Sequence, residues 1–153
     1  MPADIETKEL ASWTKIGDTE AKRFAGTARY SVEFERPAGT ADDWLLDLGK
    51  VCETARVKVN GREVGALWCE PFQINVGPFL KPGKNTLEVE VTNLAANRIR
   101  DMDQRKVNWK YFYDANLASQ RQRNGLDASV WPLRDSGLVG PVVLKPLKRI
   151  KPQ

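Results

Sequence analysis

The feature that most constrains this fold is a strict alternation of apolar and polar residues in several short segments. In residues 27–35 every second side chain is apolar, namely Ala28, Tyr30, Val32 and Phe34. Residues 86–92 alternate even more regularly. A period of two is typical of a β-strand with one buried face, because successive side chains of a strand point to opposite faces. The chain is therefore predicted to build its core from strands.

A β-hairpin is predicted at the centre of the chain. Residues 56–59 and 62–68 both read as strands, and only Asn60-Gly61 separates them. Asn and Gly both tolerate the positive φ that a two-residue type I′ turn requires. This dipeptide between two alternating segments is a strong local signal for a tight antiparallel hairpin.

The remaining segments favour an all-β antiparallel sandwich, of the jelly-roll kind. Further strands are predicted at residues 44–48, 72–76 and 142–144, with Gly- and Pro-containing turns between the strands and no convincing amphipathic helix. We expect one domain over residues 1–153, with its core at about 13–144. A long polar insertion at about 95–136 interrupts the strands, and a connection of that length is commonly functional. A short helix is expected within it, at about residues 114–123.

The composition excludes several function classes. The chain has no histidine, which removes Ser–His–Asp and Cys–His catalysis and most zinc chemistry. No apolar run approaches the roughly 18 residues of a membrane helix, and the polar, acidic residues 1–10 are no signal peptide. The net charge of +4 comes largely from a basic C-terminus that we interpret as a solvated tail, since no nucleic-acid-binding motif accompanies it.

Several segments carry a family resemblance in their order and spacing, over residues 13–144. They are residues 24–30, 46–51, 55–61, 65–68, 71–72, 80–85, 91–93, 97–98 and 136–142. Together they resemble the sugar-binding jelly-roll domain of family 2 glycoside hydrolases. The similarity is greatest to the version at the C-terminal end of bacterial family 106 α-L-rhamnosidases.

The resemblance implies a galactose-binding-like β-sandwich that accompanies a catalytic domain and carries no catalytic machinery itself. Such domains bind an oligo- or polysaccharide in some relatives, and in others brace the catalytic domain or lend a loop to its active site. The resemblance further implies a monomer that is secreted or periplasmic as part of a larger bacterial enzyme, with a plant or algal type of glycan as ligand. Neither nucleic acid nor a membrane is an expected partner.

The expected glycan site lies at one end of the sandwich. If residues 56–59 pair antiparallel with residues 86–91, as the family pattern implies, the segment after residue 67 and the insertion emerge at the same end. Sugars stack on aromatic rings and bind planar polar groups through their hydroxyls. The candidate sugar-binding residues are Trp68, Glu70, Asn97, Arg98, Trp109, Tyr111, Tyr113, Asp114, Trp131 and Arg134.

Each candidate also has a structural interpretation, which the sequence leaves open. Trp68 ends an alternating strand and is equally expected in the core, whereas the insertion aromatics Trp109 and Trp131 would serve as a small local core. Arg98 and Arg134 would then pair with Asp101 and Asp135.

Three further hypotheses concern cations, thiols and catalysis. Asp101 and Asp103 are weak candidates for a structural calcium site, although two carboxylates fall short of the six or more oxygens that calcium takes; a solvated acidic pair is the alternative. No cofactor is expected otherwise. Cys52 and Cys69 form either a disulfide or two free thiols. A glycosidase activity of the chain itself is the remote alternative, because no pair of carboxylates has the spacing of a fixed acid and base.

Overall fold

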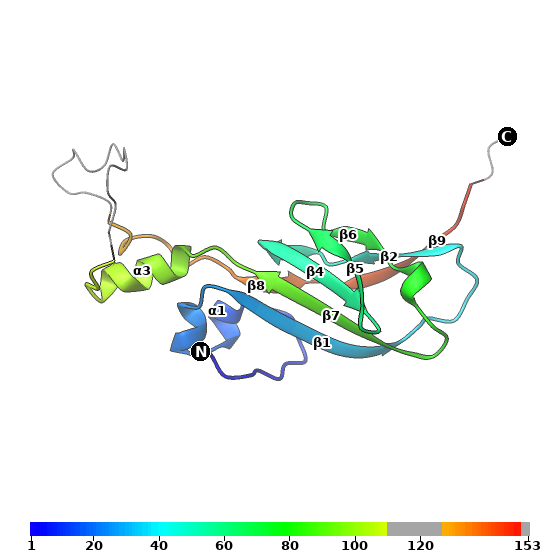
Figure 1. Ribbon diagram of the computed structural model, residues 1–153, viewed down its shortest axis with the longest axis horizontal. Coiled ribbons are helices and arrows are strands. Elements are labelled where there is room, and N and C mark those ends of the chain that lie inside the picture. Colours follow the sequence, from blue (N-terminus) through cyan, green and yellow to red (C-terminus); the bar gives the residue numbers. More distant parts are fainter. Residues whose placement is uncertain (110–126, 151–153) are drawn as a thin grey trace.

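The computed structural model describes residues 1–109 and 127–150 (Figure 1). Most of its elements are strands, joined by short helices and turns. In chain order they are α1 (Trp13–Ile16), α2 (Thr19–Lys22), β1 (Thr27–Glu35), β2 (Asp43–Asp47), β3 (Lys50–Cys52), β4 (Thr54–Val59), β5 (Arg62–Leu67), β6 (Gln73–Asn75), the 3-10 helix η1 (Gly77–Phe79), β7 (Lys84–Thr92), α3 (Ala96–Gln104), β8 (Gly137–Gly140) and β9 (Val143–Leu147).

The strands form an antiparallel β-sandwich, which confirms the predicted fold class. One sheet has the order β1-β7-β4-β5, a second has the order β6-β2-β9, and β3 pairs with β8 in a short ribbon. The inner faces supply the core, in which Leu48, Val57, Val89 and Val91 are at most 1 % exposed. Burying each such side chain stabilises the fold by about 1.5–3 kcal/mol. Trp13 and Trp44, at 5 % exposure each, are also core residues.

The central hairpin has the predicted turn. Asn60 and Gly61 have φ values of 51° and 75°, as a type I′ turn demands, and Val59 pairs with Arg62. The Asn60 side chain donates to the carbonyl of Phe79 over 2.9 Å and accepts from the backbone N–H of Thr86 over 3.1 Å. The turn is thereby tied to the start of β7.

The register of β4 decides where the two loops of interest emerge. Thr54 pairs with Thr92 of β7, and Ala55 pairs with Leu67 of β5. The antiparallel pairing of β4 with β7 is therefore confirmed. The ends of β5 and β7 lie at the same end of the sandwich, which we call the rim.

The insertion is not simply a loop, and the structure at its start was not predicted from the sequence. It begins with the nine-residue helix α3. Its sequence is strongly polar on average, so the helical period was not recognised; charged pairs one turn apart help to stabilise it, such as Asp101 with Arg105 at 2.7 Å. The short helix expected at residues 114–123 lies outside the described residues.

Two other features were missed or misjudged. Strands β3 and β8 were not predicted, because they are too short to show an alternation of apolar and polar residues. Val32 belongs to the predicted inward face of β1, yet it is 54 % exposed, because β1 is the last strand of its sheet. None of the described helices has the length and apolar character of a membrane span.

Candidate functional site

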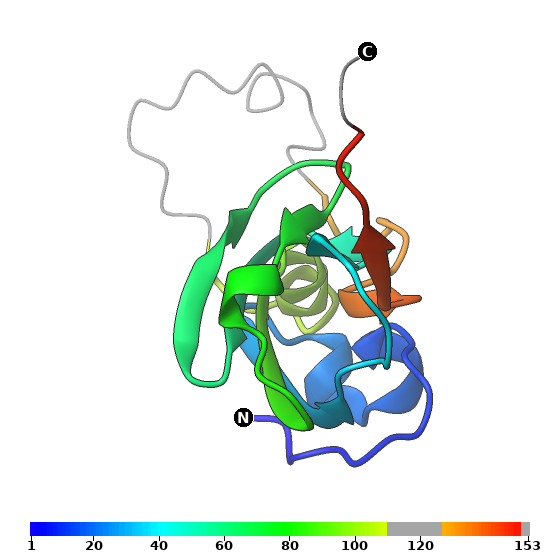
Figure 2. The ribbon, with the colours of Figure 1, turned by 90° about the vertical axis from the view of Figure 1, so that its right-hand side faces the viewer.

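The rim carries helix α3, which extends beyond the ends of β7 and β8, away from the two sheets (Figure 1). In a view from the opposite end of the sandwich, α3 is seen behind the strands (Figure 2). Trp68 follows β5 at the same end of the sandwich and is 77 % exposed. Its core interpretation is therefore wrong. Glu70 is exposed as well. The rim thus has two parts: Trp68 and Glu70 after β5, and the α3 unit, which we define as residues 95–109 and 127–136.

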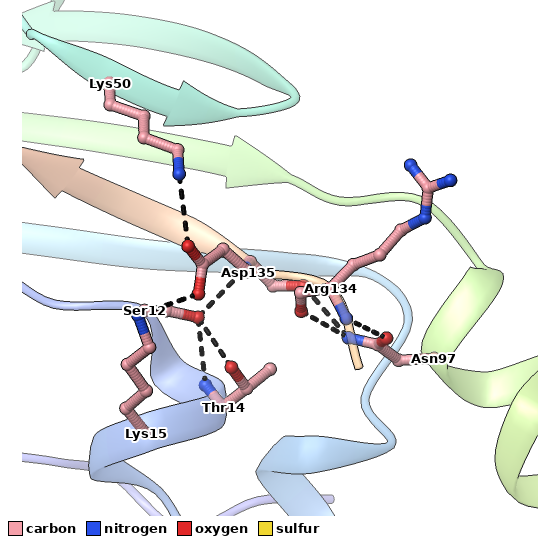
Figure 3. A network of polar contacts seen from close by, with 8 residues as sticks. Ser12, Thr14, Lys15, Lys50, Asn97, Arg134 and Asp135 are labelled. Atoms are coloured by element: carbon pink, nitrogen blue, oxygen red, sulfur yellow. Dashed lines mark hydrogen bonds and ion pairs between the residues drawn. The ribbon is translucent and has the colours of Figure 1, made fainter. Parts of the chain in front are cut away.

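A buried amide joins α3 to the segment before β8 (Figure 3). Asn97 is 2 % exposed, and its Oδ1 accepts the backbone N–H of Arg134 over 2.9 Å, while its Nδ2 donates to the Arg134 carbonyl over 2.8 Å. The same Nδ2 lies 3.4 Å from Ser136 Oγ. A sugar at the surface does not reach this side chain. Asn97, expected among the sugar ligands, is a buried support of the rim.

A second asparagine, Asn93, was not among the candidates and completes this support. Its Oδ1 accepts the backbone N–H of Gly26 over 3.0 Å, and its Nδ2 donates to the Phe24 carbonyl over 2.9 Å and to Ser136 Oγ over 3.1 Å. The backbone N–H of Ser136 donates in turn to Ser12 Oγ over 2.9 Å. The ends of β7, of α2 and of the insertion are therefore fixed at one place by buried polar groups, which stabilise a structure only when they are paired.

One carboxylate at the rim bridges two lysines (Figure 3). Asp135 accepts from Lys50 Nζ over 3.1 Å and from Lys15 Nζ over 3.2 Å. The hydrogen bond from Lys50, followed by that from Lys15, lowers the pKa of Asp135. Asp135 raises the pKa of Lys50 in return. The guanidinium of Arg134 points away from Asp135, so the expected pairing of these neighbours is not formed.

A shallow hollow of about 540 Å³ lies beside Lys50. Its lining residues come from the β2–β3 turn and the β5–β6 connection: Asp47, Gly49, Lys50, Glu70, Pro71 and Phe72. The hydrogen bond from Lys145, 2.7 Å from Asp47 Oδ2, is the main reason why the pKa of Asp47 is lowered. Glu70 was a candidate from sequence, whereas Asp47 and Lys50 were not, because only the folded chain brings the β2–β3 turn next to Glu70.

One face of α3 holds both flanks of residues 110–126. Asp103 Oδ1 accepts the indole N–H of Trp109 over 2.6 Å, and its Oδ2 accepts the backbone N–H of Ala128 over 2.7 Å. Arg100 Nε donates to the carbonyl of Trp131 over 2.7 Å. Trp109 and Trp131 are half-buried. Trp109 and Trp131 are thus held at the base of the α3 unit. Their half-buried positions favour the interpretation in which the insertion aromatics serve as a small local core.

Another face of α3 carries an ionic cluster. Asp101 pairs with Arg105 at 2.7 Å, with Arg23 at 3.7 Å and with Arg98 at 3.8 Å. The pairing of Arg98 with Asp101 is the expected one. Asp101 and Asp103 therefore face different protein donors, and the described residues contain no group of three acidic, Cys or His side chains that would hold a metal ion.

The remaining candidates divide between the described and undescribed parts. Tyr111, Tyr113 and Asp114 lie outside the described residues. Cys52 is buried, Cys69 is exposed, and both thiols are free. Burial raises the pKa of Cys52.

Comparison with known proteins relates the chain to a small part of large glycoside hydrolases, although no family model matches it. It is 39 % identical over 108 residues to the "Putative beta-glucuronidase" of Formosa agariphila, covering 65 % of this chain and 9 % of that protein. A rhamnosidase from Novosphingobium sp. PP1Y superposes with a TM-score of 0.75 at 33 % identity, over 94 % of this chain and 13 % of that one. A β-D-glucuronidase from Dictyoglomus thermophilum has a TM-score of 0.50 at 26 % identity, over 54 % of this chain and 15 % of that one.

The matched segments therefore make up less than a sixth of the length of each of these proteins. It is similar to one β-sandwich segment associated with glycoside hydrolases.

Proposed function

We propose that this chain is a non-catalytic accessory domain of a larger glycoside hydrolase, and that its α3 unit braces the catalytic domain or contributes to its active site. The finer assignment that we propose is a galactose-binding-like jelly-roll domain of the family 106 α-L-rhamnosidase kind, in a secreted or periplasmic bacterial enzyme. The similarity to short segments of a rhamnosidase and of glucuronidases supports this proposal.

The observation that carries the bracing role is the way the α3 unit is held. It stands outside the two sheets, yet Asn97 and Asp103 fix it through hydrogen bonds to Arg134, Trp109 and Ala128. Ordering a polar segment costs about 1–2 kcal/mol of backbone entropy per residue, and this unit buries little apolar surface in return. A rigid polar projection is understandable if it has to meet another domain in a defined orientation.

The charges at the rim support a non-catalytic role. A glycosidase needs two carboxyl groups roughly 5–10 Å apart, one of which stays protonated until it gives its proton to the leaving group. The lysines beside Asp135 lower its pKa, which is the opposite of what a general acid requires. Asp101 lies among arginines, and Asp103 accepts two N–H donors.

The test uses the longer enzyme that contains this chain, assayed with aryl α-L-rhamnosides and aryl β-D-glucuronides. The double variant R100Q/D103N should lower kcat/KM about ten-fold or more, because the base of the α3 unit loses its anchors. The control R56Q changes an exposed arginine of β4 and should keep the wild-type value. Unchanged kcat/KM in R100Q/D103N, or hydrolysis by the isolated chain, would refute the proposal.

A second candidate function, glycan binding at the hollow, is favoured by the exposure of Trp68. The Trp68 indole is 77 % exposed and stands two residues before Glu70 of the hollow, so it offers a stacking surface for a sugar ring. A shallow site of this kind binds weakly, with Kd values on the order of micromolar to millimolar. Arg134, another of the sequence candidates, is exposed at the same end.

Affinity electrophoresis in gels containing rhamnogalacturonan, polygalacturonate or β-glucan tests this second function. Retardation of the wild type should be lost in W68A and in E70Q. The matched control E63Q changes an exposed glutamate of β5 and should be retarded like the wild type. If no glycan retards the wild type, or if W68A and E70Q are retarded equally with it, the hollow is not a glycan site.

A further inference from the structure

Strand β1 is an open edge of the larger sheet. It pairs with β7 along its whole length in an unbroken antiparallel register, and it is the last strand of that sheet (Figure 1). Its nine residues contain neither a proline nor a bulge, two devices by which proteins keep a strand edge from pairing with another chain. Strand β1 therefore offers a long and regular edge to a further strand.

The hydrogen bonds that flank the β1–β7 pair show which backbone groups face this edge. The N–H of Asn93 donates to the carbonyl of Gly26 over 3.2 Å, and the N–H of Arg36 donates to the carbonyl of Gly83 over 3.1 Å. Gly26 and Arg36 are both even-numbered, and hydrogen-bonded pairs recur at every second residue of an antiparallel ladder. The even-numbered residues of β1 therefore bond to β7. The odd-numbered residues, from 27 to 35, direct their N–H and C=O groups to the open edge.

Residues 1–10 run past β1 without satisfying this edge. They line the same cavity as β1 (Figure 1), but their backbone makes no backbone hydrogen bond within the described part of the chain. The inward face of β1 is incompletely covered as well, since Val32 is 54 % exposed. A segment held without ladder hydrogen bonds moves aside at low free energy, so a further strand can reach the edge.

The charges of β1 match those of a second, antiparallel copy of the same strand. With Ser31 opposite Ser31 of the partner subunit, the odd-numbered residues form hydrogen-bonded pairs, and the N–H and C=O groups of the open edge gain partners. On the outer face, Arg29 then lies opposite Glu33 of the partner subunit, and Glu33 lies opposite Arg29 of the partner subunit. Opposite charges placed in this way stabilise an antiparallel pair.

The same register pairs apolar residues with apolar residues on the inner face. Val32 lies opposite Tyr30 of the partner subunit, and Ala28 lies opposite Phe34 of the partner subunit. An aromatic and a β-branched residue form a favourable cross-strand pair, and the pairing covers the exposed Val32. Charges on a strand edge normally discourage pairing with other chains. On β1 they instead select one partner and one register.

We propose that β1 pairs with β1 of a second copy of this chain about a two-fold axis at Ser31, which joins two four-stranded sheets into one. Each contact between the subunits then occurs twice, as in any isologous interface. The partner is another molecule of the same protein, in place of the monomer that the family resemblance implies. The interface shares no residue with the α3 unit or the hollow, so its test is separate from that of the proposed function.

Charge reversal tests both the partner and the register. Sedimentation velocity over a dilution series should show the wild type reversibly reaching twice the mass of the chain. R29E places carboxylates opposite each other across the interface and E33R places cations there, so each variant alone should dimerise about ten-fold more weakly or worse. A mixture of R29E with E33R restores both pairs of opposite charges and should form a heterodimer with near wild-type affinity.

The mixture also separates the contact between subunits from a contact within the chain. Arg29 pairs with Glu90 of its own chain at 3.2 Å, and R29E loses this pair whether it is alone or mixed. Rescue by mixing therefore reports only the pairing of Arg29 with Glu33 of the partner subunit. The matched control R56E reverses an exposed charge of β4, which is not an edge strand, and should dimerise like the wild type.

The backbone of the edge is tested by S31P. Proline at this position removes an N–H that faces the open edge and none that bonds to β7, and edge strands tolerate proline. S31P should therefore abolish the dimer, whereas S31A should keep it. If R29E or E33R does not fold, the comparison of S31P with S31A still decides the outcome. A monomeric wild type, equal dimerisation of S31P and S31A, or a mixture no stronger than its two components would overturn the proposal.

Discussion

Asn97 and Arg134 are joined by two hydrogen bonds in opposite directions, one accepted and one donated by the Asn97 side-chain amide. The amide binds the backbone of Arg134 much as a neighbouring strand would. A helix outside the sandwich thereby fixes the segment that leads into β8. The position of the α3 unit therefore depends in part on this buried side chain, and its removal has predictable consequences.

Replacing Asn97 with alanine should destabilise the chain by about 2–4 kcal/mol, because the N–H and the carbonyl of Arg134 both lose their partner in a buried place. Urea unfolding measures this free energy. The control N75A removes the exposed side chain of a β6 residue and should cost less than about 0.5 kcal/mol. Equal stability of N97A and N75A would show that water replaces the amide without loss.

Replacing Asp103 with asparagine should release one flank of the insertion while the sandwich stays folded. A carboxylate offers two acceptor oxygens, to Trp109 and to Ala128, whereas an amide offers one. We expect faster hydrogen exchange of the Ala128 amide, or an upfield shift of the Trp109 indole proton, in NMR spectra. Asp101 pairs with arginines on another face of α3, so D101N should change neither signal. Unchanged spectra for D103N would refute the role of Asp103 in holding Trp109 and Ala128.

Two glycines with positive φ should respond differently to alanine. Gly61 in the hairpin turn has a φ of 75° and no atom near its missing side chain, so G61A should cost about 1–2 kcal/mol from backbone strain alone. Gly137 has a φ of 97°, and a Cβ added there would clash with Tyr30 Oη and would lie 2.7 Å from Trp13 Cε3. G137A should cost more than about 3 kcal/mol or prevent folding. Thermal unfolding measures the stability that each variant loses. Equal losses in G61A and G137A would contradict the close packing around Gly137.

Acid should destabilise the chain partly through Asp135. Lys50 and Lys15 hold the pKa of this carboxyl below its ordinary value of 3.8, so the folded state favours the ionised form. Its contribution is therefore complete above about pH 5 and is lost as the pH falls through the lowered folded value. Between pH 6 and pH 3, D135N should lose less stability in urea unfolding than the wild type does.

The D135N substitution should remove only part of the acid-induced loss of stability. Asp47 has a lowered pKa too, and both lysines beside Asp135 are exposed. The exposed D4N variant, whose carboxylate makes no ion pair among the described residues, serves as control and should follow the wild type. A D135N profile that coincides with the wild type would show that water screens both lysines completely.

The strands and the hairpin could be predicted from the sequence, because their signals are local. A period of two and the Asn60-Gly61 turn depend only on which face of an extended chain is apolar and which residues accept positive φ. Together with the strand pairing that the family resemblance implied, these features also predicted that Trp68 and the insertion share one end of the sandwich. Helix α3 escaped the same method, since its stability comes from charged pairs and from contacts with residues about 30 positions away.

Where the described candidate side chains lie was decided only by the tertiary structure. The sequence could not distinguish a buried Asn97 from an exposed one, nor an exposed Trp68 from a core tryptophan, because burial depends on which distant segment packs against a residue. Asp47 and Lys50 reach Glu70 for the same reason. The local sequence pattern determined the strands. The rim was determined only when segments far apart in the chain packed against one another.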